Sequence, residues 1–260
     1  MDHVISVRNL YKCFPGNHRQ AHALRAALER ATLAPLRRAS NDSVQTEQFR
    51  WVLQDISFEI ARGECVALIG HNGAGKSVLL RVLSRVTRPT RGEADVYGKV
   101  GAMLDIGVGF NRELTGRENV FLQGAILGIK KHDLTRRFEE IVDFSGIGNV
   151  LEQPIKSYSN GMQVRLAFAI AVQLEPEILL MDEVLAVADE DFIRASIRKL
   201  AELKHDGCTI LLASHDMALL EQICTRALWF EHGQLIADGP MHALAQHYRE
   251  HILTKPPCKP

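Results

Sequence analysis

A glycine-rich segment at residues 70–77 constrains this chain of 260 residues more than any other feature. It follows an apolar run at 65–69, precedes a helical pattern at 78–83, and fits the pattern GxxxxGK[ST] with Gly70, His71, Asn72, Gly73, Ala74, Gly75, Lys76 and Ser77. Glycines let the backbone approach phosphate groups closely, and the loop N–H groups and the following helix N-terminus supply positive dipoles. In such a loop Lys76 neutralises phosphate charge and Ser77 ligates Mg²⁺. The order of strand, loop and helix therefore predicts a P-loop that binds the phosphates of a nucleotide.

Two adjacent carboxylates follow another apolar run, at residues 178–181. In a P-loop protein Asp182 would hold Mg²⁺, directly or through water, and Glu183 would polarise the water that attacks the γ-phosphate. The alternative is that Asp182 caps the next helix and that Glu183 is a solvated charge. The preceding P-loop favours the nucleotide site.

Short apolar runs separated by helical patterns indicate the fold class. The runs at 65–69, 178–181 and 209–213 are apolar on both faces, which is typical of a parallel sheet covered by helices on both sides. Strand patterns also occur at 4–7, 51–53 and 56–60, whereas residues 114–172 predict helices alone. In that segment we expect a capping box at Thr115 and Glu118 and helix ends at Gly128 and Gly146. These patterns predict an α/β core with a helical insertion.

Composition excludes several classes of protein. Lys+Arg and Asp+Glu are equal at 31 each, so no global field draws the chain to nucleic acid or to an anionic membrane. No run approaches the roughly 20 apolar residues of a membrane-spanning helix, and the first residues lack the regions of a signal peptide. The five scattered cysteines indicate neither a disulfide framework nor a zinc site. We therefore expect a reduced, cytosolic protein without a nucleic-acid partner.

A third motif, YSNGMQ at residues 158–163, precedes a helical pattern and lies shortly before the Asp182 strand. It resembles the signature motif of ATP-binding cassette (ABC) proteins, commonly written LSGGQ. The resemblance implies that Ser159 and the N–H groups from Gly161 onward bind a phosphate of the ATP held by the opposite subunit. It also implies a head-to-tail homodimer with two ATP molecules between the protomers. The alternative, an ordinary helix N-cap at Ser159, fits the same residues but does not explain their position between the other two motifs.

Other residues match further motifs of the ABC family. His215 matches the switch histidine, which contacts the γ-phosphate and orients the attacking water. Asp189 fits the loop that communicates between the two ATP sites, and Phe14 fits the aromatic residue that stacks on adenine, with Tyr11 as a competitor for that role. The best alignment places Asp105 where the family usually has a glutamine, but an ionised carboxylate cannot donate the N–H bond of a glutamine.

The resemblance extends over nearly the whole chain and implies its organisation. We expect an ABC nucleotide-binding domain at residues 1–252 and a tail at 253–260. Within the domain we expect a basic insert at 15–50 and a helical subdomain carrying the signature motif at about 110–172. The implied fold is an α/β P-loop NTPase of ABC type, with a mostly parallel core sheet, an antiparallel β portion and the inserted helical subdomain.

The segments 114–120, 160–169 and 182–187 resemble the ATP-binding subunits that export polysaccharides such as O-antigen, capsule and teichoic acid. This implies an ATPase that uses ATP and Mg²⁺ and lies peripherally on the cytoplasmic face of the inner membrane. Its partners would be a second copy of itself and a separate integral-membrane permease, and its cargo a lipid-linked glycan. In that group a basic insert lies near the membrane and the glycan entry; the alternative for the insert is a solvated segment without a ligand.

Three other functions stay open at this point. The chain could be an ABC ATPase for another lipid or for a drug, or a soluble ABC protein that acts on ribosomes or DNA ends. Such soluble proteins typically hold two cassettes or a long coiled coil, and neither pattern occurs here. The third is a nucleotide-binding module without turnover, which the intact set of Lys76, Asp182, Glu183 and His215 disfavours.

Overall fold

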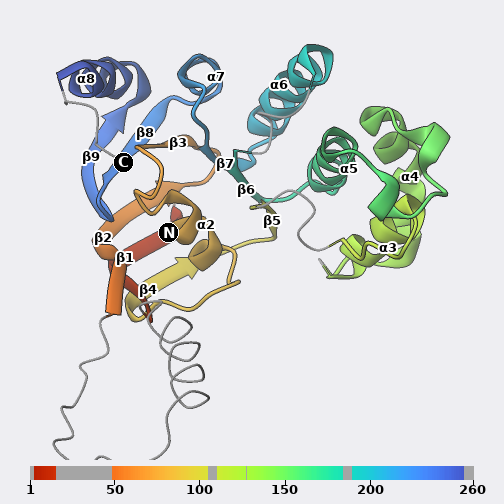
Figure 1. Ribbon diagram of the computed structural model, residues 1–260, viewed down its shortest axis with the longest axis horizontal. Helices are drawn as coiled ribbons and strands as arrows, with labels where there is room; N and C mark the ends of the chain where they lie inside the picture. The colour runs from red at the N-terminus through yellow and green to blue at the C-terminus, as the bar shows by residue number, and fades with distance from the viewer. Residues whose placement is uncertain (1–2, 16–48, 105–109, 127, 184–188, 255–260) are drawn as a thin grey trace, which may run out of the picture.

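The structure, a computed structural model, describes residues 3–15, 49–104, 110–126, 128–183 and 189–254. The described residues form two β-sheets and a set of helices, arranged as Figure 1 shows. In chain order the longer elements are β1 (His3–Pro15), β2 (Phe49–Ala61), β3 (Cys65–Ile69), α2 (Lys76–Leu83), β4 (Arg91–Val96), β5 (Val100–Met103), α3 (Gly116–Ile126), α4 (Lys131–Ser145), α5 (Asn160–Gln173), β6 (Ile178–Asp182), α6 (Glu190–His205), β7 (Thr209–Ala213), α7 (Met217–Ile223), β8 (Arg226–Glu231), β9 (Gln234–Pro240) and α8 (Met241–Thr254). Two short 3-10 helices, Gly148–Val150 and Ile155–Ser157, lie between α4 and α5.

The larger sheet has the strand order β5-β6-β7-β3-β8-β9. Neighbouring strands from β5 to β8 pair in parallel, and β9 pairs antiparallel with β8. Both faces of β3 are buried: Cys65, Ala67 and Ile69 pack in one hydrophobic cluster, and Val66 and Leu68 pack in another. Helices α5 to α8 contribute to the first cluster, and α2 contributes to the second. The prediction of a mostly parallel sheet with two covered faces is confirmed.

The smaller sheet is antiparallel, with the order β2-β1-β4. Helix α2 lies between the two sheets (Figure 1), and its Leu79 and Leu80 are buried with Ile5 and Ile56 of the small sheet and Leu68 of the large one. Because α2 begins at the P-loop, this packing fixes the loop against both sheets. The expected antiparallel portion is present, and it packs against the helix that begins at the P-loop.

One strand explains two separate sequence patterns. The stretches 51–53 and 56–60 belong to the single strand β2, and the alternation is interrupted because Asp55 adopts a left-handed φ of 54° where the pairing with β1 shifts register. Asn9 of β1, also at positive φ, donates from Nδ2 to Asp55 Oδ1 at 3.0 Å. Strand β1 itself continues well beyond the predicted stretch 4–7. The interruption is thus a β-bulge rather than the end of a strand.

Helices α3, α4 and α5 share a separate hydrophobic cluster, and in Figure 1 they lie to one side of both sheets. The predicted capping box opens α3: the Thr115 N–H donates to Glu118 Oε2 at 2.8 Å, and the Glu118 N–H donates to Thr115 Oγ1 at 3.1 Å. Gly146 ends α4 with a left-handed φ of 65°, and Gly128 follows α3 with a φ of 73°. The helix boundaries here follow from local caps that the sequence displays.

Some predictions lie outside the described residues. They concern most of the basic insert, the end of the tail, and Asp105. Among the described helices, none is both long and apolar enough to cross a membrane.

Candidate nucleotide-binding site

The P-loop connects the end of β3 to the start of α2. Gly70, Gly73 and Gly75 all have positive φ, at 142°, 81° and 106°, a region that favours glycine. A side chain at Gly70 would in addition place its Cβ 2.2 Å from the carbonyl oxygen of Phe230. At Gly73 a Cβ would meet no atom within 4 Å, so there the requirement is the backbone conformation alone. The glycines predicted to shape a phosphate cradle therefore have the conformation that a cradle needs.

Lys76, the first residue of α2, is buried with 4% of its surface exposed. Its Nζ donates to the carbonyl oxygens of Gly70 at 2.6 Å and His71 at 3.2 Å, so the ammonium group lies over the loop. Burial lowers the pKa of Lys76, whereas the charges of Glu183 and Asp182 act to raise it. A buried cation that donates to backbone carbonyls would gain free energy from an anion in the cradle. This is the electrostatic character of a phosphate site.

Asp182 and Glu183 lie at the carboxyl end of β6, beside the end of β7. Asp182 is the last residue of β6 and pairs with Ala213, and the Glu183 N–H donates to the Ala213 carbonyl at 2.8 Å. Neighbouring parallel strands end at the same edge of the sheet, so His215, just after β7, lies next to Glu183. Its Nε2 is 2.8 Å from Glu183 Oε1, with 47% and 40% of the two side chains exposed. The structure thus brings together the predicted general base and the predicted switch histidine at a solvent-accessible position.

Glu183 has an unusual backbone conformation. Its φ is 54°, in the left-handed region that costs a non-glycine residue free energy. Such strain persists where surrounding structure over-determines it, and it concentrates at functional sites. Here the hydrogen bond from Glu183 to β7 and the contact with His215 hold the residue in place. The geometry therefore supports a functional carboxylate rather than a freely solvated charge.

Asp182 does not cap α6, the next helix among the described residues. Helix α6 begins at Glu190, and its N-cap is Asp189, whose Oδ1 accepts from the Phe192 N–H at 2.9 Å. Asp189 Oδ2 also lies 3.3 Å from Arg165 Nη2, and the Arg165 guanidinium lies 5.0 Å from the centre of the Phe192 ring. The residue predicted to communicate between two ATP sites therefore joins α5 to α6. We did not single out Arg165 from the sequence, because no local pattern shows which residue faces Asp189.

The signature segment forms the start of α5. Ser159 is its N-cap, with Oγ accepting from the Met162 N–H at 3.2 Å, and Gly161 lies in the first turn. Ser159 and Asn160 are exposed, so the N-terminus of the helix is open to solvent. The helix-cap role is confirmed, and it is compatible with a phosphate role because the exposed end carries a positive dipole. Within one chain, the N-terminus of α5 lies in the helical part of the molecule, whereas the P-loop lies between β3 of the large sheet and α2.

Phe14 and Tyr11 differ in their availability for adenine. Phe14 lies near the end of β1 with 38% of its surface exposed, and the Lys12 ammonium is 4.8 Å from its ring centre. Tyr11 is half-buried and packs edge-on against Trp51, with ring centres 5.9 Å apart. The more exposed ring of Phe14 suits stacking on a ligand better than that of Tyr11. Its role stays a prediction, as does that of Asp105 outside the described residues.

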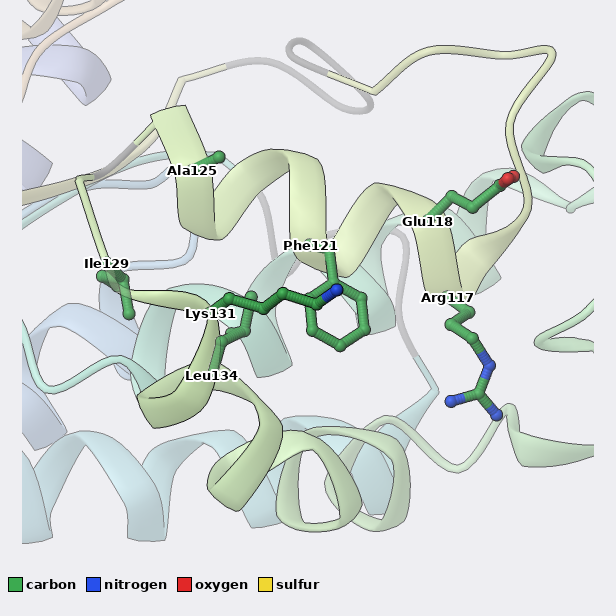
Figure 2. Close-up of a pocket in the computed structure, with 7 residues that line it drawn as sticks. All are labelled: Arg117, Glu118, Phe121, Ala125, Ile129, Lys131 and Leu134. Carbon is green, nitrogen blue, oxygen red and sulfur yellow. The ribbon is translucent and has the colours of Figure 1, made fainter.

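A cavity of about 480 Å³ lies apart from all of these residues, between α3 and α4 (Figure 2). Its walls are mainly apolar, and Figure 2 shows Phe121 pointing into it, with charged side chains at its margins. Seven residues line it: Arg117, Glu118, Phe121, Ala125, Ile129, Lys131 and Leu134. None belongs to the predicted nucleotide site. The cavity therefore offers a surface for a different role.

The β8–β9 hairpin is a feature that the sequence analysis missed. Its turn, at His232 and Gly233, contacts the P-loop through a hydrogen bond from the Gly233 N–H to the Ala74 carbonyl at 3.2 Å. The signal that could have found it is the apolar stretch 227–230, followed by a His-Gly pair and a second strand pattern. The hairpin forms one wall beside the loop.

Comparison with known proteins defines the class of protein to which this site belongs. Residues 53–186, about half of the chain, match the family model described as ABC transporter. The chain belongs to the ABC transporter family. The predicted fold class, an ABC-type P-loop ATPase, is confirmed.

Two relatives and one solved structure show which ABC proteins this chain is similar to. The chain is 43% identical over 198 residues to the O-antigen export system ATP-binding protein RfbB of Klebsiella pneumoniae, a match that covers 76% of this chain and 80% of that protein. It is 40% identical over 205 residues to the teichoic acids export ATP-binding protein TagH of Bacillus anthracis, covering 79% of this chain and 37% of that protein. The fold is similar, with a TM-score of 0.73 and 19% identity, to a dimeric ATP-binding cassette in a post-hydrolysis state bound to ADP and Pi, over 91% of this chain and 98% of that one. The predicted resemblance to polysaccharide-export subunits is confirmed by the first two.

Proposed function

We propose that this chain is the ATP-hydrolysing subunit of an exporter that carries a lipid-linked polysaccharide across the inner membrane. The observation that carries the ATPase part is the Glu183–His215 contact of 2.8 Å, at the sheet edge that also carries Asp182 and near the buried Lys76. The names of the O-antigen and teichoic acid relatives support the substrate class. We favour this function over export of another lipid or a drug, because both relatives act on surface polysaccharides.

The residues of the site also suit a magnesium ion. Ser77 supplies a hydroxyl and Asp182 a carboxylate, and oxygen donors of this kind are the ligands that Mg²⁺ prefers. A magnesium ion held there would neutralise negative charge on the nucleotide phosphates. Ser77 and Asp182 would hold it, and Lys76 would contact the same phosphates from the loop.

Hydrolysis then depends on positions that this chain provides. Glu183 accepts a hydrogen bond from the attacking water and increases its nucleophilicity, while His215 holds the carboxylate and faces the γ-phosphate. The N–H groups of the loop from Gly73 to Ser77 stabilise the charge that remains on the β-phosphate when the γ-phosphoryl group leaves. Phe14 stacks on the adenine ring. The protein contributes positioning and electrostatics, and ATP supplies the free energy.

The exposed start of α5 supports a homodimer. Ser159 and Gly161 lie at the start of α5, in the helical part of the molecule, and offer N–H groups and the positive end of a helix dipole. We propose that they bind the ATP held by the P-loop of a second copy. Asp189, linked through Arg165 to α5, would transmit the state of one site to the other. Two ATP molecules would lie between two protomers arranged head to tail.

We further propose that α3, with the cavity in Figure 2, faces a separate membrane-embedded permease. The chain would then lie peripherally on the cytoplasmic face of the membrane, with domain limits at 1–252 and a tail at 253–260. The insert at 15–50 would lie near the membrane and the glycan, where its arginines could contact anionic lipid or phosphate groups.

Export in whole cells tests the proposed function. Cells without the chain should accumulate lipid-linked polysaccharide inside, and the wild-type gene should restore its surface display. A variant with Arg19, Arg25, Arg37 and Arg38 reversed to Glu should keep basal ATPase activity and impair export. If this variant restores export, the insert is a solvated segment without a ligand. If cells lacking the chain display a wild-type amount of surface polysaccharide, the proposed substrate is wrong. A separate test is the neighbouring coding sequences, which should include a permease and glycosyltransferases.

A further inference from the structure

The turn between β8 and β9 is fixed against the P-loop by backbone contacts. The Gly233 N–H donates to the Ala74 carbonyl at 3.2 Å, and the Gln54 N–H donates to the Gly233 carbonyl at 2.8 Å. Side chains have no room at two points around this junction: a Cβ at Gly70 of the P-loop would lie 2.2 Å from the Phe230 oxygen of β8, and a Cβ at Gly233 of the turn would lie 2.3 Å from the Val52 oxygen of β2. The side chains on the two loops are therefore held at a defined separation by the fold itself.

Three side chains of types that can ligate a metal lie at this junction: His71 of the P-loop, Glu231 at the end of β8 and His232 of the turn. One ligand atom from each lies within 4.8 Å of the other two, and this is the one such cluster of three among the described residues. The His71 and His232 rings have centres 5.1 Å apart. Both imidazoles are exposed, and Glu231 is half-buried. The cluster is thus open to an ion from solvent.

Hydrogen bonds prepare two of these side chains for an ion. His71 Nδ1 lies 2.7 Å from the Asn72 carbonyl oxygen. Because a carbonyl only accepts, Nδ1 carries the hydrogen and Nε2 presents a lone pair, which is the arrangement usual in metal-bound histidines. On the other side, His251 Nε2 of α8 lies 3.4 Å from Glu231 Oε1 and orients that carboxylate. These second contacts resemble the outer partners of protein metal sites.

We propose that His71, Glu231 and His232 bind one divalent transition-metal ion of the zinc class. Two imidazoles and one carboxylate suit Zn²⁺, with water completing the shell, whereas Mg²⁺ and Ca²⁺ prefer oxygen ligands alone. Ligand atoms around tetrahedral zinc lie roughly 3.3 Å apart for metal–nitrogen bonds of about 2.0 Å, so modest rotation of the exposed imidazoles closes the site. This site is separate from the Ser77 and Asp182 oxygens, and it does not depend on what the protein exports.

The ion would link the second residue of the P-loop to the β8–β9 turn. His71 belongs to the loop that would bind the nucleotide phosphates, so an ion on His71 and a nucleotide in the loop place charges close together, and each changes the other's affinity by the same factor. The described structure thereby offers a point at which a metal ion regulates the nucleotide site from outside it.

Direct metal titration tests the proposal. Tag-free chain is titrated with Zn²⁺ by calorimetry, and with Co²⁺ by visible absorption, in zinc-free buffer containing excess Mg²⁺ and no nucleotide. We expect one ion per chain, and a loss of affinity of at least about tenfold in His232→Asn and in Glu231→Gln. Asparagine is chosen because it tolerates the φ of 49° at position 232. The matched control is His205→Asn, an exposed histidine at the end of α6, which should bind as wild type does.

Two results would overturn the site. One is unchanged Zn²⁺ affinity in both His232→Asn and Glu231→Gln. The other is a thiolate-to-cobalt absorption band that disappears on replacing Cys13 or Cys258 by serine, because the ion would then be held by cysteine. Thermal unfolding and Mg²⁺-dependent ATPase activity of His232→Asn in zinc-free buffer should match wild type, which shows that reduced metal affinity does not come from a misfolded chain.

Discussion

The sheets and the helical part of this molecule are organised by different physical means. In the large sheet, β3, β6 and β7 are buried on both faces, and the proposed chemical groups follow directly from their carboxyl ends. Helices α3, α4 and α5 instead share a smaller cluster and border a cavity of about 480 Å³. The comparison teaches that tight packing holds reactive side chains in place, while a looser helical part is suited to contact a partner and to move.

The largest expected effect lies at the edge of the large sheet. Glu183→Gln should leave ATP binding intact and reduce hydrolysis by about 10²- to 10⁴-fold, because the amide keeps the shape but cannot act as a base. Phosphate release and equilibrium nucleotide binding measure the two effects separately. The exposed Glu202→Gln on α6 is the control. Undiminished hydrolysis in Glu183→Gln would remove the base from the proposed mechanism.

Alanine substitutions of two leucines compare the packing between the sheets with the packing in the helical part. Leu80→Ala, between the two sheets, should lower the free energy of unfolding by about 2–5 kcal/mol, because neighbouring side chains cannot collapse into the gap. Leu134→Ala should lie at the lower end, about 2 kcal/mol, because Leu134 borders the cavity and its side chain has fewer packing contacts to lose. Urea unfolding measures both, with Leu80→Met as a volume-conserving control. Equal losses would show that the helical part is packed as tightly as the sheets.

Substitutions at Ser159 separate a helix cap from a phosphate contact. Ser159→Asp keeps a good N-cap for α5, so the free energy of unfolding should change by less than about 0.5 kcal/mol. Its negative charge would repel the phosphate of a second protomer's ATP, and ATPase activity should fall at least about tenfold. Ser159→Ala, which loses the cap at a cost of about 1 kcal/mol, is the comparison. Full activity in Ser159→Asp would leave the residue with its capping role alone.

The smallest effect is expected in the helical cavity. Ala125→Glu introduces a carboxylate on the exposed rim shown in Figure 2, and covering that charge with a permease would cost free energy. Surface polysaccharide should decrease by roughly threefold, a loss of under 1 kcal/mol in coupling, while basal ATPase activity stays at the wild-type level. Ala125→Ser is the matched control. If ATPase activity falls in parallel with export, the cavity belongs to the ATPase and the contrast between the two regions fails.

How much of the fold the sequence predicts depends on how far apart in the chain the interacting residues are. The bounds of β3 and β7 equal the predicted runs, because a strand buried on both faces shows an uninterrupted apolar pattern. The capping box at Thr115 is equally local. By contrast, the strand pattern of β2 is interrupted between 51–53 and 56–60 for a reason that the sequence does not show, because the bulge at Asp55 depends on the partner strand β1. The β8–β9 hairpin has a local sequence pattern, but its position beside the P-loop could not be predicted, because the two segments are far apart in the chain.

The sequence by itself determined the P-loop, the class of fold, the family and the types of residue at the site, because these depend on residues adjacent in the chain. Only the tertiary structure decided which side chains meet. The contact between Glu183 and His215 exists because β6 and β7 are neighbours in the sheet, and the burial of Lys76 depends on α2 lying between two sheets. The junction of His71 with His232 likewise requires the turn after β8 to pack on the loop after β3. Strand order and packing bring together residues that no local pattern relates, and those contacts set the chemistry.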